Sequence, residues 1–416
     1  MFLKPAGLWR HHNFMLLWTG QTISVFGSMI GVVAMSFTAI LFLHATPFQL
    51  GVLGAARLVP GFLTSLLAGA WVDRLRRRPI LIATDIARAV VLASIPLAAY
   101  FHELRMGQLY MVAFLMSILT IFFDVSYESY LPSIVRREDL IESNSKLSAS
   151  ASISEIGGFS VAGWLVQLFT APFGILIDAF SFIFSAIFLS FISSKEQSKA
   201  PVQRQSIRVE IGEGLNQVIR NPLLKASAIC TIIRELSWGI NGTLVLLYMT
   251  KGIGFQPGIL GVIWAVGGVS SLFAAVVAAR TTKRFGIGPT MIMSLLFAGV
   301  AMTFIPLAKG ATLASALLLI ASQLLGDGAV IIYEINKVSL QQSVAPKAML
   351  GRVNASMQFI GIGATLVGSL LGGILGEIIG VRPTLMLGAF GVLLSMCWLL
   401  FSPIRKLYTM PEASEV

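Results

Sequence analysis

The sequence predicts an all-α membrane protein with twelve transmembrane helices arranged as two pseudo-symmetric six-helix bundles. Three observations predict this fold: the scarcity of charge, the recurrence of long apolar runs, and an internal repeat. Of the 416 residues, 56% are hydrophobic and 12% are charged, whereas a soluble domain carries about 25% charged residues. A chain this apolar is suited to lipid rather than to water.

Apolar runs recur along nearly the whole chain, and each is long enough for the roughly 20-residue helix that crosses a hydrocarbon core. A transmembrane β-barrel would instead show segments of about 10 alternating residues. The expected spans are residues 15–43, 50–72, 79–101, 108–130, 147–169, 173–193, 222–249, 257–279, 288–308, 311–335, 352–377 and 383–403. An even number of spans places both termini on one side of the membrane.

Basic residues are concentrated at the termini and in alternate loops. These segments and the helix ends next to them carry 22 of the 30 Lys and Arg residues, and the intervening loops carry four, namely Arg105, Lys251, Lys309 and Arg382. Because Lys and Arg are enriched in cytoplasmic loops, we expect both termini in the cytoplasm. The same bias accounts for the net charge of +11, so we expect a lipid bilayer and no nucleic acid as partner.

The two halves of the chain repeat at a constant offset of 210 residues. Matched positions include Gly51 with Gly261, Asp124 with Glu334, and Gly163 with Gly373. The match runs without a gap from the second span to the twelfth, so a six-helix unit has been duplicated in parallel orientation. Parallel repeats of this kind occur in transporters that bind substrate near the bilayer midplane, between the repeats.

The longest hydrophilic break, residues 194–221, separates these halves. We therefore expect an N-terminal bundle at 1–193, a cytoplasmic linker at 194–221 and a C-terminal bundle at 222–416. In the linker, SIRVEIGEGLNQVIR places Ile207, Ile211, Leu215 and Val218 on one helical face. This spacing predicts a short amphipathic helix on the inner membrane surface, although two glycines weaken the pattern.

The loop between the second and third spans carries the motif GAWVDRLRRRP at residues 69–79. It resembles the loop signature G-x-L-A-D-R-x-G-R-R/K-x of the major facilitator superfamily. The matching residues are Gly69, Asp73, Arg74, Arg77 and Arg78, and Arg76 replaces the second glycine. The stretches NFMLLWTGQTISVFGS, DIARA, LPSIVRREDLIESNS and QQSVAPKAMLGRVNAS resemble the branch of macrolide-efflux and enterobactin-exporter proteins, which are drug:proton antiporters of the bacterial inner membrane.

This resemblance implies a gating role for the loop. Asp73 is expected to meet the end of the eleventh helix in the other half, and an arginine of the loop to reach Asp124 on the fourth helix. These contacts would latch the cytoplasmic side closed. Asp124 and Glu334 occupy equivalent places in the two halves, and we favour gating over proton carriage for both. The duplicated loop has Lys283 in place of the aspartate, so the first loop is the stronger gate.

Ionisable residues inside the spans are functional candidates, because a charge at mid-bilayer costs at least about 2.5–3.5 kcal/mol. The candidates for proton coupling or substrate binding are Glu155, Arg234, Glu235 and Asp327. The other intramembrane charges are Arg57, Asp85, Arg88, Glu128, Asp178 and Lys337. Structural roles are the alternatives: an ion pair for Arg234 and Glu235, backbone contacts for Asp327, and helix packing near Glu155.

No P-loop pattern, no metal-ligand spacing and no nucleophile–base pair is evident, so we expect neither an enzyme nor a cofactor. Burial favours the protonated form of a carboxyl group, which can then carry a proton across the membrane. We therefore expect a monomeric, proton-coupled secondary transporter that exports an apolar or amphipathic small molecule, such as a macrolide or a siderophore, by alternating access. The alternatives are an importer, a lysolipid or lipid transporter, or a non-transporting membrane receptor on the same fold.

Overall fold

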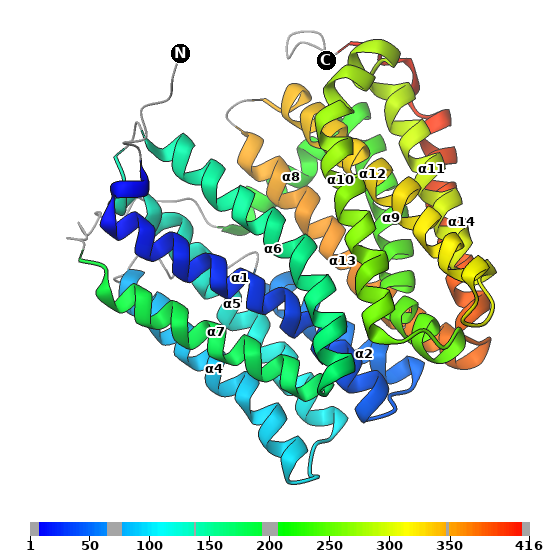
Figure 1. The fold of residues 1–416 in the computed structure, drawn as a ribbon. Coiled ribbons are helices and arrows are strands. Elements are labelled where there is room, and N and C mark those ends of the chain that lie inside the picture. Colours follow the sequence, from blue (N-terminus) through cyan, green and yellow to red (C-terminus); the bar gives the residue numbers. More distant parts are fainter. Residues whose placement is uncertain (1–7, 65–76, 137–138, 194–206, 347–348, 410–416) are drawn as a thin grey trace. The chain divides into compact units, whose positions relative to one another are not determined.

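The computed structural model describes residues 8–64, 77–136, 139–193, 207–346 and 349–409. Within this part of the chain the regular structure is entirely helical (Figure 1). The long helices are α1 (His12–Phe37), α2 (Pro47–Thr64), α4 (Arg77–Tyr100), α5 (Met106–Ile134), α6 (Leu140–Leu168), α7 (Ala171–Phe191), α9 (Pro222–Leu247), α10 (Pro257–Phe285), α11 (Ile287–Leu307), α12 (Leu313–Val344), α13 (Leu350–Ile378) and α14 (Val381–Phe401). The shorter α8 spans Ile207–Arg220.

These helices confirm the predicted fold class. In the described part of the chain, nine of them are long and apolar enough to cross a membrane. The described part of α2 is apolar but shorter. The helices α6 and α9 carry more polar residues, among them Glu142 and Lys146 on α6 and Arg234 and Glu235 on α9. Together with α2, α6 and α9, the nine apolar helices make twelve long helices in the described ranges.

The internal repeat is visible in the helix boundaries. Both bounds of α1, α6 and α7 differ by 210 from the bounds of α9, α13 and α14. Even the π-helical turn η2 (Thr38–Phe42), which extends α1, returns at the same offset as η4 (Tyr248–Gly252), which extends α9. The duplication therefore governs local backbone geometry as well as the apolar pattern.

The helices cluster into two compact units. One contains α1, α4, α5, α6, α7 and the first five residues of α10; the other contains α2, α8, α9, the rest of α10 and α11 to α14. The core of the first surrounds Phe14, Phe123 and Tyr130. The core of the second surrounds Met291, Tyr333 and Leu340. The predicted bundle boundaries at residues 193 and 222 stay a prediction.

Two helix pairs approach each other through glycines at repeat-related positions. In the second unit, a Cβ on Gly51 of α2 would lie 3.0 Å from the Cα of Gly373 on α13 and 2.9 Å from the carbonyl of Ser369. In the first unit, a Cβ on Gly163 of α6 would lie 3.1 Å from the Cα of Gly261 at the start of α10. Backbones meet directly at both places, as small residues permit in membrane helices.

The amphipathic helix expected in the linker region is present as α8. Val218 is buried against the second core, and Glu213 pairs with Arg352 of α13. A Cβ on Gly214 would collide with the backbone of Arg352, so one of the glycines that weakened the sequence pattern lets α8 lie against α13. Its predicted position on the inner membrane surface stays a prediction.

We predict that Gly51→Ala lowers the midpoint of thermal unfolding in detergent, whereas Gly61→Ala on the same helix leaves it unchanged or raises it. Alanine in a helix is normally favoured over glycine by about 0.8–1.0 kcal/mol, and no atom lies within 4 Å of a Cβ placed on Gly61. At Gly51 the added methyl overpacks the contact, which costs about 1–3 kcal/mol. If both variants shift the midpoint of thermal unfolding in the same direction, the close contact between Gly51 and α13 is contradicted.

Candidate functional site

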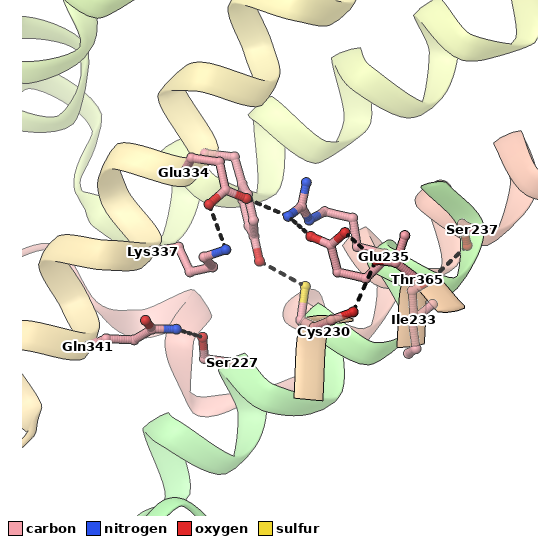
Figure 2. Close-up of polar contacts among 12 residues, drawn as sticks. Ser227, Cys230, Ile233, Glu235, Ser237, Glu334, Lys337, Gln341 and Thr365 are labelled. Carbon is pink, nitrogen blue, oxygen red and sulfur yellow. Dashed lines mark hydrogen bonds and ion pairs between the residues drawn. The ribbon is translucent and has the colours of Figure 1, made fainter. Parts of the chain in front are cut away.

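One cluster of charged side chains lies in the second unit, between α9 and α12 (Figure 2). Arg234 of α9 donates hydrogen bonds to Glu235 and to Glu334 of α12. The Nζ atom of Lys337 lies 2.6 Å from the other oxygen of Glu334. The second oxygen of Glu235 accepts a hydrogen bond of 3.1 Å from the hydroxyl of Thr365 on α13. Two cations and two carboxylates therefore balance one another.

Helix geometry explains part of this arrangement. Glu334 and Lys337 are three residues apart on α12 and so share a face. Arg234 and Glu235 are adjacent, which favours separate partners, and Arg234 does reach Glu334 while keeping its bond to Glu235. Beneath the cluster, the fully buried Tyr333 has its ring centre 5.2 Å from the Arg234 guanidinium. The hydroxyl of Tyr333 lies 3.3 Å from the sulfur of Cys230.

A cavity of about 400 Å³ borders this cluster. Its lining mixes charged, polar and apolar side chains from four helices. They are Leu58 of α2; Thr231 and Glu235 of α9; Lys337, Val338 and Gln341 of α12; and Asn354, Met357, Gln358, Gly361, Ile362 and Thr365 of α13. The buried hydroxyl of Thr231 has no hydrogen-bond partner within the described ranges. The cavity wall can therefore offer a bound molecule both apolar contact and hydrogen bonds.

Asp327 lies elsewhere on α12, beside a smaller cavity of about 60 Å³ that Trp238 and Met302 also line. The side chain of Gln323 donates a 3.2 Å hydrogen bond to Asp327. A Cβ on Gly267 of α10 would collide with this carboxyl group, so the glycine makes room for it. Asp327 is thus held in a packed polar contact with a side chain, and the choice between a coupling role and a structural role for it stays a prediction.

The first unit contains a second charged cluster, around Arg88 of α4. The guanidinium of Arg88 lies between the rings of Phe123 and Phe182, 4.1 Å from each ring centre. It bonds to Asp85, one helical turn earlier, and both side chains are almost completely buried. The buried Asp178 and the exposed Asp124 are close enough to interact electrostatically with Arg88. This cluster thus holds three carboxyl groups and one cation.

The two clusters share a repeat-related feature. Phe123-Asp124 on α5 and Tyr333-Glu334 on α12 differ by the offset of 210, and in each pair the aromatic ring lies against an arginine. The arginine itself comes from α4 in the first unit and from α9 in the second. The duplicated acid therefore kept its aromatic neighbour while its cation came from a different helix.

Only some of the remaining predicted residues belong to the described part of the chain. Gly69, Asp73 and Arg74 lie outside the described residues, as does the side chain of Glu155, so the predicted latch stays a prediction. Arg77 and Arg78 open α4, and Arg78 donates a 3.0 Å hydrogen bond to the carbonyl of Leu189 and another to Ser190, at the end of α7. Arg57 on α2 and Glu128 on α5 are exposed side chains.

Sequence reasoning missed several members of both clusters. Tyr333, Thr365 and Phe182 are neutral and carry no signal of their own in an apolar chain. The repeat offered one usable signal, because an aromatic residue precedes the matched acid in each half. Asp178 was recognised only as one of several intramembrane charges, yet the structure brings it to Arg88.

We predict that Glu334→Gln destabilises the protein by about 2 kcal/mol, less than the 3–5 kcal/mol of a fully buried pair, because the Glu334 side chain is 31% exposed. The substitution leaves Lys337 unbalanced. The double variant Glu334→Gln/Lys337→Gln restores neutrality and should recover part of the loss, as measured by thermal unfolding in detergent. A double variant as unstable as Glu334→Gln would show that charge balance is not what stabilises the cluster.

Known proteins are similar to this chain in sequence. The uncharacterized MFS-type transporter YfiS of Bacillus subtilis (strain 168) is 26% identical over 379 residues, covering 89% of this chain and 88% of its own length. The multidrug efflux pump Tap of Mycolicibacterium fortuitum is 25% identical over 387 residues, covering 88% and 92%.

Among solved structures, the nucleoside transporter NupG has the same fold, with a TM-score of 0.76 at 12% identity, covering 93% of this chain and 98% of NupG. The sequence model of the Major Facilitator Superfamily matches residues 17–365, which is most of the chain. Together with the duplicated all-helical fold, this match shows that the chain belongs to the major facilitator superfamily.

Proposed function

We propose that this protein is a proton-coupled secondary transporter that exports an apolar or amphipathic small molecule across the bacterial inner membrane by alternating access. The observation that carries the proposal is the cavity of about 400 Å³ next to a charge network, in a chain of a transporter family. A small-molecule site typically has a volume of about 300–1,000 Å³ and a mostly apolar lining with a few placed polar groups.

The lining of this cavity suits an amphipathic ligand. Leu58, Met357 and Ile362 supply apolar surface. The amides of Gln341, Asn354 and Gln358 can each donate and accept hydrogen bonds. Because Glu235 and Lys337 offer opposite charges at the same wall, a neutral or zwitterionic group fits better than a strongly charged one.

Export is favoured over import by the relatives. The protein Tap is named a multidrug efflux pump, and the residues that resemble macrolide exporters lie in both halves of this chain. In this proposal both termini lie in the cytoplasm, as the distribution of Lys and Arg indicates, and the protein works as a monomer.

The decisive experiment measures transport in inverted membrane vesicles with an imposed pH gradient, using a macrolide, a cationic dye and a catecholate siderophore as cargoes. We expect at least one of them to accumulate in the vesicles when their interior is acidic, and to leave when the gradient is collapsed. Digestion of a C-terminal tag by protease added outside these vesicles checks the orientation. If no cargo shows pH-dependent flux, the importer, lipid-transporter or receptor alternatives replace this proposal.

The cavity can be tested separately by filling it. A Cβ on Gly361 would lie 3.7 Å from Thr231 and 3.8 Å from Glu235 without a clash, so Gly361→Leu should fold while its side chain occupies the cavity. We expect a loss of about tenfold in efflux rate at low cargo concentration, equivalent to about 1.4 kcal/mol.

The matched control is Gly351→Leu on the same helix, where nothing lies within 4 Å of an added Cβ. This variant should transport at the wild-type rate. Equal rates for both variants would place the cargo outside this cavity.

A further inference from the structure

Asp178 lies in a notch of α1 that two glycines create. Gly27 and Gly31 are one helical turn apart on α1, and a Cβ at Gly31 would collide with the carboxyl group of Asp178 on α7. Asp178 is only 3% exposed. One of its oxygens receives weak hydrogen bonds from the hydroxyls of Ser28, at 3.4 Å, and Ser181, at 3.3 Å. The carboxyl group is therefore enclosed by protein and held by neutral donors.

The charged groups around Asp178 do not balance it. Among the described side chains of the helices packed against α7, α1 carries only His12 as an ionisable group, and α6 carries the ion pair of Glu142 and Lys146. The helix α4 carries Asp85 and Arg88, and also Arg77 and Arg78 in its first turn. Arg78 donates hydrogen bonds to the carbonyls of Leu189 and Ser190 at the far end of α7, so it does not pair with Asp178. Arg88 is already bonded to Asp85, so Asp178 has no cation of its own among these groups. An unpaired charge in such a place costs several kcal/mol.

Arg88 is nevertheless within reach of Asp178. Phe182 is four residues from Asp178 on α7 and therefore lies on the same face, and the Arg88 guanidinium lies 4.1 Å from the Phe182 ring centre. The Nε of Arg88 and one oxygen of Asp85 are buried without a hydrogen-bond partner in the described part of the chain. Each member of the Arg88–Asp85 pair thus has one buried polar atom that can still form a hydrogen bond.

We propose that Asp178 is the binding site of the coupling proton and that Arg88 exchanges between Asp85 and Asp178 as that proton binds and leaves. With Asp178 protonated, Arg88 pairs with Asp85, as in this structure. When Asp178 releases its single proton to water, Arg88 moves from Asp85 to Asp178. The new carboxylate then accepts hydrogen bonds from Arg88. This inference rests on the proposed proton coupling, and it assigns that role to the first unit rather than to the balanced cluster of Arg234.

The charge state can be tested without any cargo. In wild-type protein reconstituted in liposomes at neutral pH, the infrared carbonyl stretch of a protonated carboxylic acid should be present. Asp178→Asn should remove this band, Asp178→Glu should keep it at a shifted position, and Asp124→Asn should leave it in place. Asp178→Asn should also unfold at the wild-type temperature or above, because the amide replaces a neutral acid. An unchanged band, or strong destabilisation by Asp178→Asn, would overturn the proposal.

Transport of erythromycin separates this inference from the proposed function. We expect wild-type vesicles to accumulate erythromycin with a pH gradient, and Asp178→Asn to lose that accumulation while retaining erythromycin exchange without a gradient. If the Asp178→Asn variant still accumulates erythromycin in response to the pH gradient, the coupling role of Asp178 is overturned, but the proposed function is not. If the wild-type protein transports neither erythromycin nor the other cargoes in a way that depends on the pH gradient, proton coupling is overturned, and this inference with it.

Discussion

The cost of placing charge in a low-dielectric interior is the constraint on which the rest of this structure depends. An apolar chain of this kind can keep ionisable side chains only if they are paired, hydrogen-bonded or protonated. The second unit uses pairing, because Arg234 and Lys337 balance Glu235 and Glu334. The first unit contains more carboxyl groups than cations around Arg88, so pairing alone does not satisfy it.

This difference gives the two units different chemistry despite their common origin. A balanced network stays neutral as a whole, and this one borders the cavity of about 400 Å³. It is suited to holding a cargo without exchanging protons. A cluster with an excess of carboxyl groups changes its charge when a proton binds or leaves. In our proposals, energy coupling and cargo recognition therefore use separate sets of side chains.

The glycines connect this chemistry to helix packing. Gly51 and Gly373 let α2 and α13 meet backbone to backbone, Gly163 and Gly261 do the same for α6 and α10, and Gly27 and Gly31 admit the carboxyl group of Asp178 to α1. Contacts made by backbone rather than by interdigitating side chains can separate without repacking a core. The same residue type therefore provides close packing between helices and space for a polar group.

The sequence by itself determined the number and positions of the helices, the duplication and the family, because apolar runs, the 210-residue offset and the loop signature are local or periodic features. It also identified Arg234, Glu235 and Glu334, since a charge in an apolar run is conspicuous. It could not rank Asp178 above Asp327. The partners that distinguish these acids come from other helices: Arg88 from α4 and Ser28 from α1 for Asp178, and Gly267 from α10 for Asp327. Only the tertiary structure decided which acid has a cation, because the energy of a buried charge depends on neighbours that are distant in the chain.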